Sequence, residues 1–393
     1  MGHAERAHAL LSASSAHRWV VCTPSARLEE QFPDQSSEAA AEGTLAHELA
    51  ELKLRHYFQT VEFGKTKYTR TVNKLKKHGL WQNEMDDHTD TYLDYVKAKA
   101  MAFKSQPSVA IEKKVDFSQW VPEGFGTADC ILISGGTIHV IDFKYGKSPE
   151  GRVDAEGNPQ MALYALGAYE AYKLLYPVRE VRMSIVQPRL PDGISEWGCS
   201  IEELLAYGDY VRGKAELAFR GEGTFRPGDR TCRYCRARGR CRARAEKNVE
   251  LAFFTEKDPK LLSNEELGEY LKKGTDVARW LGDIQDLALA ECLAGNTVPG
   301  WKAVEGRGSR EWTDMDQAFA MLKDSGVPEE LLWERKALTL AQVEKTIGKK
   351  AFEAAVGNMA VKKPGKPALV DEKDNRPAIT NKITAAEAFK EDI

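Results

Sequence analysis

Two carboxylates and a lysine have the spacing that most clearly suggests chemistry. Asp142 and Lys144 lie two positions apart at the end of an apolar stretch, so in a strand their side chains share a face. Asp129 lies 13 residues before Asp142, on the neighbouring strand of a predicted hairpin, where the two can meet. Adjacent carboxylates repel unless a cation separates them, and oxygen ligands suit Mg²⁺ or Mn²⁺. The pattern predicts a metal site in which Lys144 orients a hydroxide or stabilises a charged phosphoryl group.

Four more residues extend this set. Glu112 lies on the preceding predicted strand and is a candidate further ligand. His47 lies in an early predicted helix, and Gln160 and Tyr164 are spaced i, i+4 on a later helix, so they share a face. Taken singly, each feature also fits an ordinary role: exposed charges on a hairpin, a glutamine in a first helical turn, a core tyrosine or a structural histidine.

Three cysteines suggest a second site. Cys232, Cys235 and Cys241 supply three thiolates within ten residues. A tetrahedral zinc site and a 4Fe–4S cluster both need a fourth ligand, and Cys22, ahead of the His47 helix, is the candidate. The other cysteines are predicted to be buried core thiols: Cys130, Cys199 and Cys292.

Basic residues crowd around these cysteines. Residues 226–244 hold eight arginines and one acid, a composition that favours phosphate binding, although charge runs are often only solvated surface. Residues 65–78 hold six Lys/Arg and no acid, and are a candidate second wall of a groove. The residues predicted to contact DNA are Arg233, Arg236, Arg238, Arg240, Lys74, Lys76 and Lys77.

Periodicity and turn signals predict the elements that position these residues. We expect helices over residues 38–58, 83–103, 159–175 and 201–219, within 246–300, and onward to about 356. We expect strands over 108–115, 127–134, 137–143, 181–187 and 194–199, with Gly135-Gly136 turning an antiparallel meander. A hairpin is predicted within 301–312, and an extended or disordered tail from 362. The element order predicts an α/β or α+β fold with a mixed sheet.

Composition sets the wider frame. The 393 residues carry a formal net charge of −3 and are 42% hydrophobic, which excludes collagen-like, wholly disordered and histone-like polycationic chains. No apolar run is long enough for a transmembrane helix, and no secretory signal is visible. Seven cysteines, an odd number, fit a reducing cytoplasm, so we expect a cytoplasmic protein without a membrane partner.

Together, the motifs resemble the PD-(D/E)xK nuclease superfamily, specifically its RecB-like exonuclease branch. The matching order is a helical histidine, then Gly-x-x-Asp, Asp-x-Lys and Gln-x-x-x-Tyr, all within residues 43–164. The resemblance implies a restriction-endonuclease-like core in which Lys144 positions the attacking water, and Gln160 and Tyr164 contact DNA or steady the site. The metal ligands it implies are His47, Asp129, Asp142, the Phe143 backbone carbonyl and, as a further candidate, Glu112.

The cysteines extend the resemblance to the AddB-type and CRISPR-associated members of that branch. In those proteins one cysteine precedes the nuclease core and three follow it, as Cys22 precedes and Cys232, Cys235 and Cys241 follow here. The resemblance favours a structural 4Fe–4S cluster that clips the two ends of the domain together. Zinc remains the alternative.

These observations predict a metal-dependent DNA nuclease, an exonuclease rather than a site-specific endonuclease, that acts on linear or single-stranded DNA ends. We expect a nuclease domain over residues 1–245, a mainly helical accessory region over 246–360 and a tail over 361–393. Segments such as 298–307 resemble a phage- and prophage-encoded family of uncharacterised proteins, which implies a role in phage DNA replication or recombination beside an annealing protein or helicase. The alternatives are a non-catalytic DNA-binding recombination-accessory protein and a zinc-stabilised structural protein.

Overall fold

Five strands form one mixed sheet in the order β1-β2-β3-β4-β5. The strands are β1 (Ser108–Asp116), β2 (Phe125–Ser134), β3 (Thr137–Phe143), β4 (Glu180–Val186) and β5 (Ile194–Ser200). The first three form the predicted antiparallel meander, β3 pairs in parallel with β4, and β5 is antiparallel to β4. The parallel step requires a crossover, and α6 (Pro159–Tyr172) supplies it. The predicted mixed α/β architecture is confirmed.

The turn between β2 and β3 fixes the register that the site depends on. Gly135 and Gly136 both have positive φ, 58° and 87°, which glycine adopts without strain, and Ser134 pairs with Thr137 across them. The ladder continues to the pair of Cys130 with Ile141, so one step further Asp129 lies opposite Asp142. A slip of one residue would turn every side chain to the other face.

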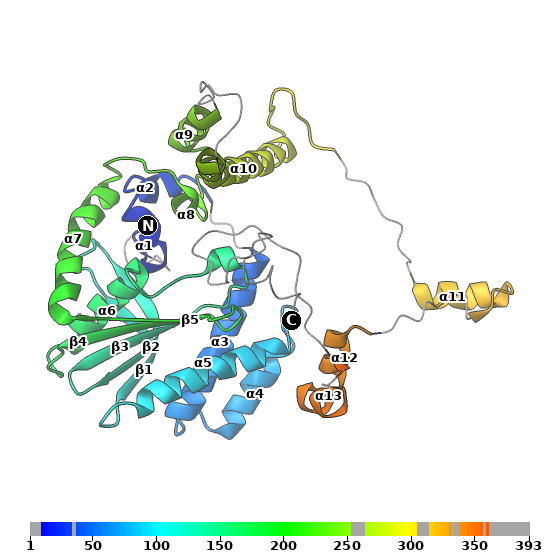
Figure 1. The fold of residues 1–393 in the computed structure, drawn as a ribbon, viewed down its shortest axis with the longest axis horizontal. Coiled ribbons are helices and arrows are strands. Elements are labelled where there is room, and N and C mark those ends of the chain that lie inside the picture. The colour runs from blue at the N-terminus through cyan, green and yellow to red at the C-terminus, as the bar shows by residue number, and fades with distance from the viewer. Residues whose placement is uncertain are drawn as a thin grey trace, which may run out of the picture. The chain divides into compact units, whose positions relative to one another are not determined.

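Helices cover both faces of the sheet (Figure 1). One face packs against α3 (Glu38–Phe58), α4 (Lys65–Leu75) and α5 (Glu84–Met101), where side chains such as Leu49 and Tyr92 meet Phe143 in one apolar core. The other face packs against α1 (Ala16–Trp19), α6 and α7 (Ile201–Arg220) in a second core. Ser37 caps α3 by accepting a hydrogen bond from Ala40 N–H. The sheet is thus buried between two helical layers.

The structure is a computed structural model that describes residues 9–33, 37–252, 264–304, 314–329, 332–333, 338–356 and 359–360. The chain divides into two compact units, Met1–Val304 and Glu305–Ile393. The first unit also contains α2 (Ser25–Glu29), α8 (Asp229–Cys232), α9 (Arg242–Ala252) and α10 (Asn264–Leu293). The second contains α11 (Met315–Asp324), α12 (Leu340–Ile347) and α13 (Lys349–Val356), as expected for a helical region.

Two sequence predictions concern segments that the structure largely does not describe. The hairpin around residues 306–308 and the tail from 362 lie outside the described residues. Just before the predicted hairpin, the structure describes an isolated β-bridge between Val298 and Trp301. Among the described helices, none has the length and apolar composition needed to cross a membrane.

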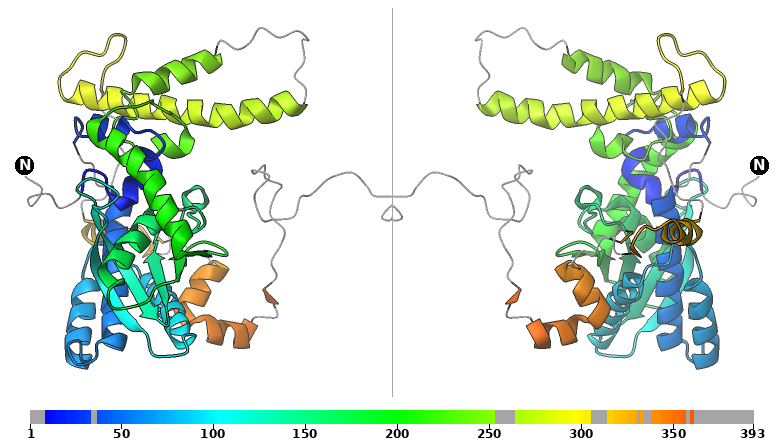
Figure 2. Two further views of the ribbon diagram at one scale, coloured as in Figure 1. Left: turned by 90° about the vertical axis from the view of Figure 1, so that its left-hand side faces the viewer. Right: turned by 90° about the vertical axis from the view of Figure 1, so that its right-hand side faces the viewer.

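The long helix α10 packs across the end of the first unit, beside the short helices α2 and α8 (Figure 2). Its acidic side faces the cysteine-bearing loop, where the Arg244 guanidinium is 0% exposed and pairs with Asp276 and Asp283 at 3.2 and 2.5 Å. A fully buried guanidinium needs such partners, because an unpaired buried charge is very costly. The opposite charges of these two neighbouring segments therefore neutralise each other.

A polar network runs from the buried His139 and Ser184 of the sheet to Tyr95 of α5 and the exposed Glu196. His139 Nε2 lies 2.7 Å from Ser184 Oγ, and the Tyr95 hydroxyl lies 2.7 Å from both that oxygen and Glu196 Oε1. Burial lowers the pKa of His139 to about 4. The folded protein therefore holds this imidazole neutral under conditions where the unfolded chain protonates it.

The buried histidine predicts acid sensitivity. Below pH 6.5 the unfolded chain takes up a proton at His139 that the folded chain takes up only near pH 4, so stability falls as pH drops through this window. From pH 7 to 5, the loss attributable to this group is about 2 kcal/mol. Urea unfolding of the parent and of His139→Gln at both pH values measures the difference. An identical pH dependence in the two proteins would contradict this assignment.

Candidate functional site

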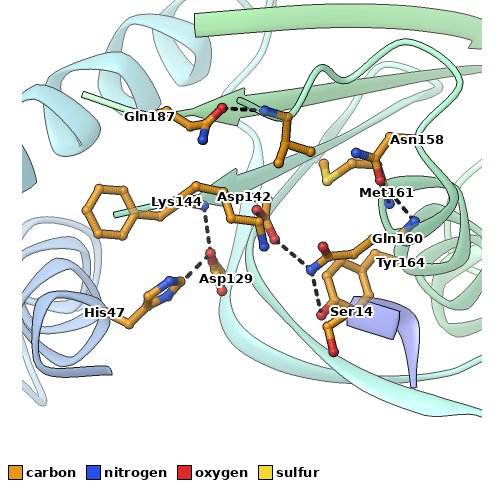
Figure 3. A network of polar contacts seen from close by, with 12 residues as sticks. Ser14, His47, Asp129, Asp142, Lys144, Asn158, Gln160, Met161, Tyr164 and Gln187 are labelled. Carbon is orange, nitrogen blue, oxygen red and sulfur yellow. Dashed lines mark hydrogen bonds and ion pairs between the residues drawn. The ribbon is translucent and has the colours of Figure 1, made fainter. Parts of the chain in front are cut away.

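Three potential metal ligands converge where α3, β1 and β2 meet. One ligand atom each from His47, Glu112 and Asp129 lies within 4.8 Å of the others, and the structure describes no other such trio of histidine, cysteine, aspartate or glutamate. His47 Nδ1 is 3.6 Å from Asp129 Oδ2, and Figure 3 shows both side chains directed toward each other. The Phe143 N–H donates to the same aspartate oxygen at 2.7 Å. Residues widely separated in the sequence thus form one cluster.

The predicted aspartate–lysine pair adjoins this cluster. Asp142 is 2% exposed, and its Oδ2 lies 3.0 Å from Lys144 Nζ. Gln160 Nε2 donates to Asp142 Oδ1 and to the Tyr164 hydroxyl, each at 3.3 Å (Figure 3). Apart from the lysine ion pair, Asp142 Oδ2 receives no hydrogen bond from any residue that the structure describes. A buried, under-used carboxylate oxygen beside two other carboxylates fits a ligand of a hard cation.

Glu112 is held in a strained backbone conformation. Its φ is 48°, in the left-handed region, although the pairs Ile111–Cys130 and Lys113–Ala128 on either side keep the β1–β2 register. Such a conformation costs a non-glycine residue roughly 1–3 kcal/mol and survives only where surrounding structure enforces it. The strain lies at the strand position opposite Asp129, which is a reason to expect a functional role for this carboxylate.

The electrostatics favour a cation at this point. Burial, followed by repulsion from Asp129 and Glu51, raises the pKa of Glu112 to about 7. Burial also raises the pKa of Asp142, while Lys144 opposes the rise. For Asp129 burial acts upward as well, but His47 and Lys144 outweigh it and lower the pKa. The residues present therefore fit a divalent cation, which would neutralise carboxylates that otherwise repel one another.

A glycine explains how Tyr164 reaches the site. A Cβ at Gly126 would lie 2.8 Å from Tyr164 Cε1, closer than real contacts allow. Only glycine therefore lets α6 bring the tyrosine ring against β2, three residues before Asp129. Asn158 begins this helix by accepting hydrogen bonds from the backbone N–H groups of Gln160 and Met161. The glycine of the Gly-x-x-Asp motif is thus required because a side chain there would collide with the Tyr164 ring.

Two residues at the rim carried no sequence signal. Gln187, just after β4, accepts a hydrogen bond from Val153 N–H at 2.9 Å and so ties down the loop that follows Lys144. The Arg189 side chain, 8% exposed, pairs with Glu42 at 2.9 Å and lies over the Tyr145 ring. An isolated Gln-x-Arg after a strand is too common a sequence to have been recognised. Val153 lies 34 residues from Gln187, and the partners of Arg189 lie more than forty residues away.

The four cysteines proposed from the sequence line a common cavity. Cys22, Cys232, Cys235 and Cys241 all contribute to its wall, together with residues such as Phe225. All four are free thiols. Arg226 N–H donates to Cys22 Sγ, and Gly228 N–H donates to Cys232 Sγ, each at 3.4 Å. Backbone donors aimed at sulfur are the surroundings that metal-bound thiolates need.

The spacing of the sulfurs can be compared with that of a tetrahedral zinc site. In a tetrahedral zinc site the sulfurs lie about 3.8 Å apart, because each is about 2.3 Å from the ion. No three of these described sulfurs lie within 4.8 Å of one another. Burial raises the pKa of Cys235 to about 12 and also raises those of Cys22 and Cys232. The described sulfurs therefore do not form a closed tetrahedral thiolate site.

The N-terminal helices are fastened to this loop. Arg18 and Glu29 form a buried ion pair at 2.7 Å, and Arg236 N–H donates to the same glutamate at 2.8 Å. Thr23 Oγ1 donates to the Glu222 carbonyl at 2.6 Å. These contacts bring Cys22 beside cysteines that follow it by more than two hundred residues. They were not visible in the sequence.

The predicted DNA-binding residues fall into two groups. Arg238 pairs with Asp283 at 2.8 Å, Arg240 pairs with Glu291, and Lys76 lies 3.5 Å from Asp86. Arg236 is exposed and Arg233 is half-buried, while Lys74 and Lys77 are exposed on and just beyond α4. A DNA role stays a prediction for all of them, but the pairs with acids account for part of the basic loop.

The remaining cysteines largely agree with expectation. Cys130 and Cys199 are buried in the two cores, as predicted for structural thiols. Cys292 is only half-buried, near the end of α10, so the prediction that it is a buried core thiol is wrong. An amphipathic surface helix exposes part of every turn, and this position lies at its edge.

Comparison with known proteins gives a family and distant matches among the solved structures. The model of the family described as "Protein of unknown function (DUF2800)" matches residues 8–377. A solved structure entitled "Crystal structure of SSO0001" is 15% identical over 50% of this chain and 85% of that chain, with a TM-score of 0.24. A likeness at this level supports no conclusion about fold or function.

The close approach of Gly126 and Tyr164 predicts a strongly coupled pair. Gly126→Ala should destabilise the fold by about 1–3 kcal/mol, because the new methyl group meets the Tyr164 ring. In a Tyr164→Ala background the same change should cost much less, since the obstructing ring is absent. Urea unfolding of the four proteins measures the coupling. Equal costs in both backgrounds would show that the contact does not constrain α6.

Proposed function

We propose that this chain, which belongs to the DUF2800 family, is a divalent-metal-dependent deoxyribonuclease of the RecB-like PD-(D/E)xK type. The observation that carries the proposal is the convergence of the His47, Glu112 and Asp129 ligand atoms within 4.8 Å, next to the buried Asp142–Lys144 pair. A structural role does not account for three carboxylates gathered at the end of a sheet. Metal-dependent hydrolysis of a phosphodiester uses such a set to hold the cation.

The side chains of the site have different roles according to where they lie. His47, Glu112, Asp129 and Asp142 would hold Mg²⁺ or Mn²⁺, with the Phe143 carbonyl as a further ligand implied by the family resemblance. The cation supplies Lewis acidity toward a phosphoryl oxygen and lowers the pKa of bound water. Lys144 Nζ, anchored 3.0 Å from Asp142, would orient the attacking water and offset charge on the phosphate.

Gln160 and Tyr164 serve a positioning role. The glutamine amide bridges Asp142 Oδ1 and the tyrosine hydroxyl, so it fixes the carboxylate from the side opposite Lys144. A fixed carboxylate keeps its second oxygen, which contacts Lys144 but accepts no hydrogen bond from any other described residue, available for the cation. The substrate we propose is linear DNA or single-stranded DNA ends, with a phage annealing protein or helicase as partner in the cytoplasm.

For the cysteine cavity we propose a structural 4Fe–4S cluster held by Cys22, Cys232, Cys235 and Cys241. The wide sulfur spacing and the backbone donors at Cys22 and Cys232 support it over zinc. The cluster would clip the N-terminal helices to the loop after α7 and thereby close a loop of about two hundred residues. Its role is to hold the domain together rather than to take part in hydrolysis.

The nuclease proposal predicts a sharp dependence on two side chains. With Mn²⁺ and linear DNA, Asp142→Asn and Lys144→Ala should each lose at least about a hundredfold in cleavage rate, because each removes charge at the reacting phosphate. Lys147→Ala is the matched control: it removes an exposed lysine from the same loop and should cleave like the parent.

Two results decide the case. If both site variants digest DNA as fast as the control, the assigned residues are wrong. If the parent binds DNA but never cleaves it with either metal, a non-catalytic accessory protein is the better description.

The cluster proposal predicts an iron-dependent fold. Protein purified without air should be brown and contain iron and sulfide. Cys22→Ser should lose most of the iron and melt at a lower temperature, while Cys292→Ser, which changes a cysteine outside the cavity, should do neither. Colourless parent protein with stoichiometric zinc would contradict the proposal, as would full iron retention in Cys22→Ser.

A further inference from the structure

Helix α4 presents an exposed row of cations along one side. Its outer surface is open and slightly concave, and four basic residues line it together with Thr66, Thr69 and Asn73. We call these four residues the α4 cation face: Lys65, Arg70, Lys74 and Lys77. All four are exposed, and no acidic residue lines this surface.

The α4 cation face differs from the other basic surfaces by lacking internal partners. The structure gives none of its four residues an ion pair with a described acid. By contrast Lys76 pairs with Asp86, and Lys67 lies 3.7 Å from the centre of the Phe63 ring. Three of the arginines near the cysteines pair with acids of α10: Arg238, Arg240 and Arg244. The free positive charge of this part of the fold is therefore concentrated on α4.

The helix itself is weakened by this arrangement. It begins with Lys65, has no acid in its first turn, and its N-cap, Gly64, provides no side-chain hydrogen bond. A helix N-terminus favours negative charge, and like charges at i, i+4, as in Arg70–Lys74, repel. An anion bound along this side would remove both penalties. The cost makes sense if a polyanion is the normal occupant.

The opposite side of α4 fixes its place relative to the metal centre. Val72 and Leu75 are buried in the same core as Leu45 and Leu49 of α3, the helix that carries His47. The Tyr68 ring stacks on His56 of α3 with centroids 4.3 Å apart. The α4 cation face is therefore attached rigidly to the helix that supplies a metal ligand.

We propose that the α4 cation face binds the phosphodiester backbone of the DNA on which the metal centre acts. This inference rests on the proposed function. The eleven residues of α4 span about 16 Å, or roughly five nucleotide steps along a strand, and Lys77 lies just beyond them. Lysine, threonine and asparagine on a shallow surface contact phosphates without entering a groove, so binding depends on salt and not on sequence.

The test compares two quadruple variants with the same charge change. One replaces the α4 cation face by glutamine: Lys65→Gln, Arg70→Gln, Lys74→Gln and Lys77→Gln. The other replaces three exposed lysines and one exposed arginine on other parts of the chain: Lys104→Gln, Arg179→Gln, Lys272→Gln and Lys302→Gln. Affinity for fluorescent single- and double-stranded oligonucleotides is measured without cleavage, in EDTA, across a range of salt concentrations.

The α4 variant should bind DNA at least about tenfold more weakly, and the slope of log affinity against log salt should fall by about 3, as expected for four lost phosphate contacts. The control should keep the parent's slope. Melting temperature checks folding, and the α4 variant should equal or exceed the parent because the repulsion within α4 is gone. An unchanged slope, or equal losses in both variants, would overturn the inference.

This outcome is separable from the nuclease proposal. Lys144→Ala should bind DNA like the parent while failing to cleave it. A parent that binds through α4 but never cleaves removes the nuclease proposal alone. A parent that cleaves equally well with and without the α4 cation face removes this inference alone.

Discussion

The first unit is organised around three carboxylates that share one end of the sheet. Glu112, Asp129 and Asp142 come from three adjacent strands, and in a buried site their mutual repulsion is strong. Lys144 and His47 offset part of it, while burial, with a smaller contribution from this repulsion, raises the pKa values of Glu112 and Asp142. We propose that a divalent cation supplies the missing positive charge. On this account the hairpin register, the strained Glu112 backbone and Gly126 are all ways of keeping these groups together.

Much of this arrangement could be predicted from the sequence. The Gly135-Gly136 turn fixes the β2–β3 register, so the meeting of Asp129 with Asp142 follows from counting residues back from the turn. The spacing of Gln160 and Tyr164 likewise places both on one helix face. Local signals suffice here because a hairpin and a single helix are short-range structures. The mixed sheet follows from the order of the elements.

Other features depend on contacts between distant segments and left no local signal. Arg189 reaches Glu42 and Glu84, and Arg244 is buried against Asp276 and Asp283. The loop around the cysteines looks in the sequence like a free basic surface. In the fold, acids of α10 pair with part of this loop. The net charge of a sequence segment therefore overestimates how many of its cations are free to bind a ligand. The unpaired cations of α4 became distinguishable only once those pairs were known.

The central claim is that a hard divalent cation binds between the sheet and α3. The most direct test is a crystal structure of the protein soaked in Mn²⁺, with anomalous data collected at the manganese edge. The account predicts a peak bounded by His47, Glu112, Asp129 and Asp142, and its loss in Asp129→Asn crystals soaked in the same way. A parent crystal with no peak there at saturating Mn²⁺, or with its manganese bound elsewhere, would contradict it.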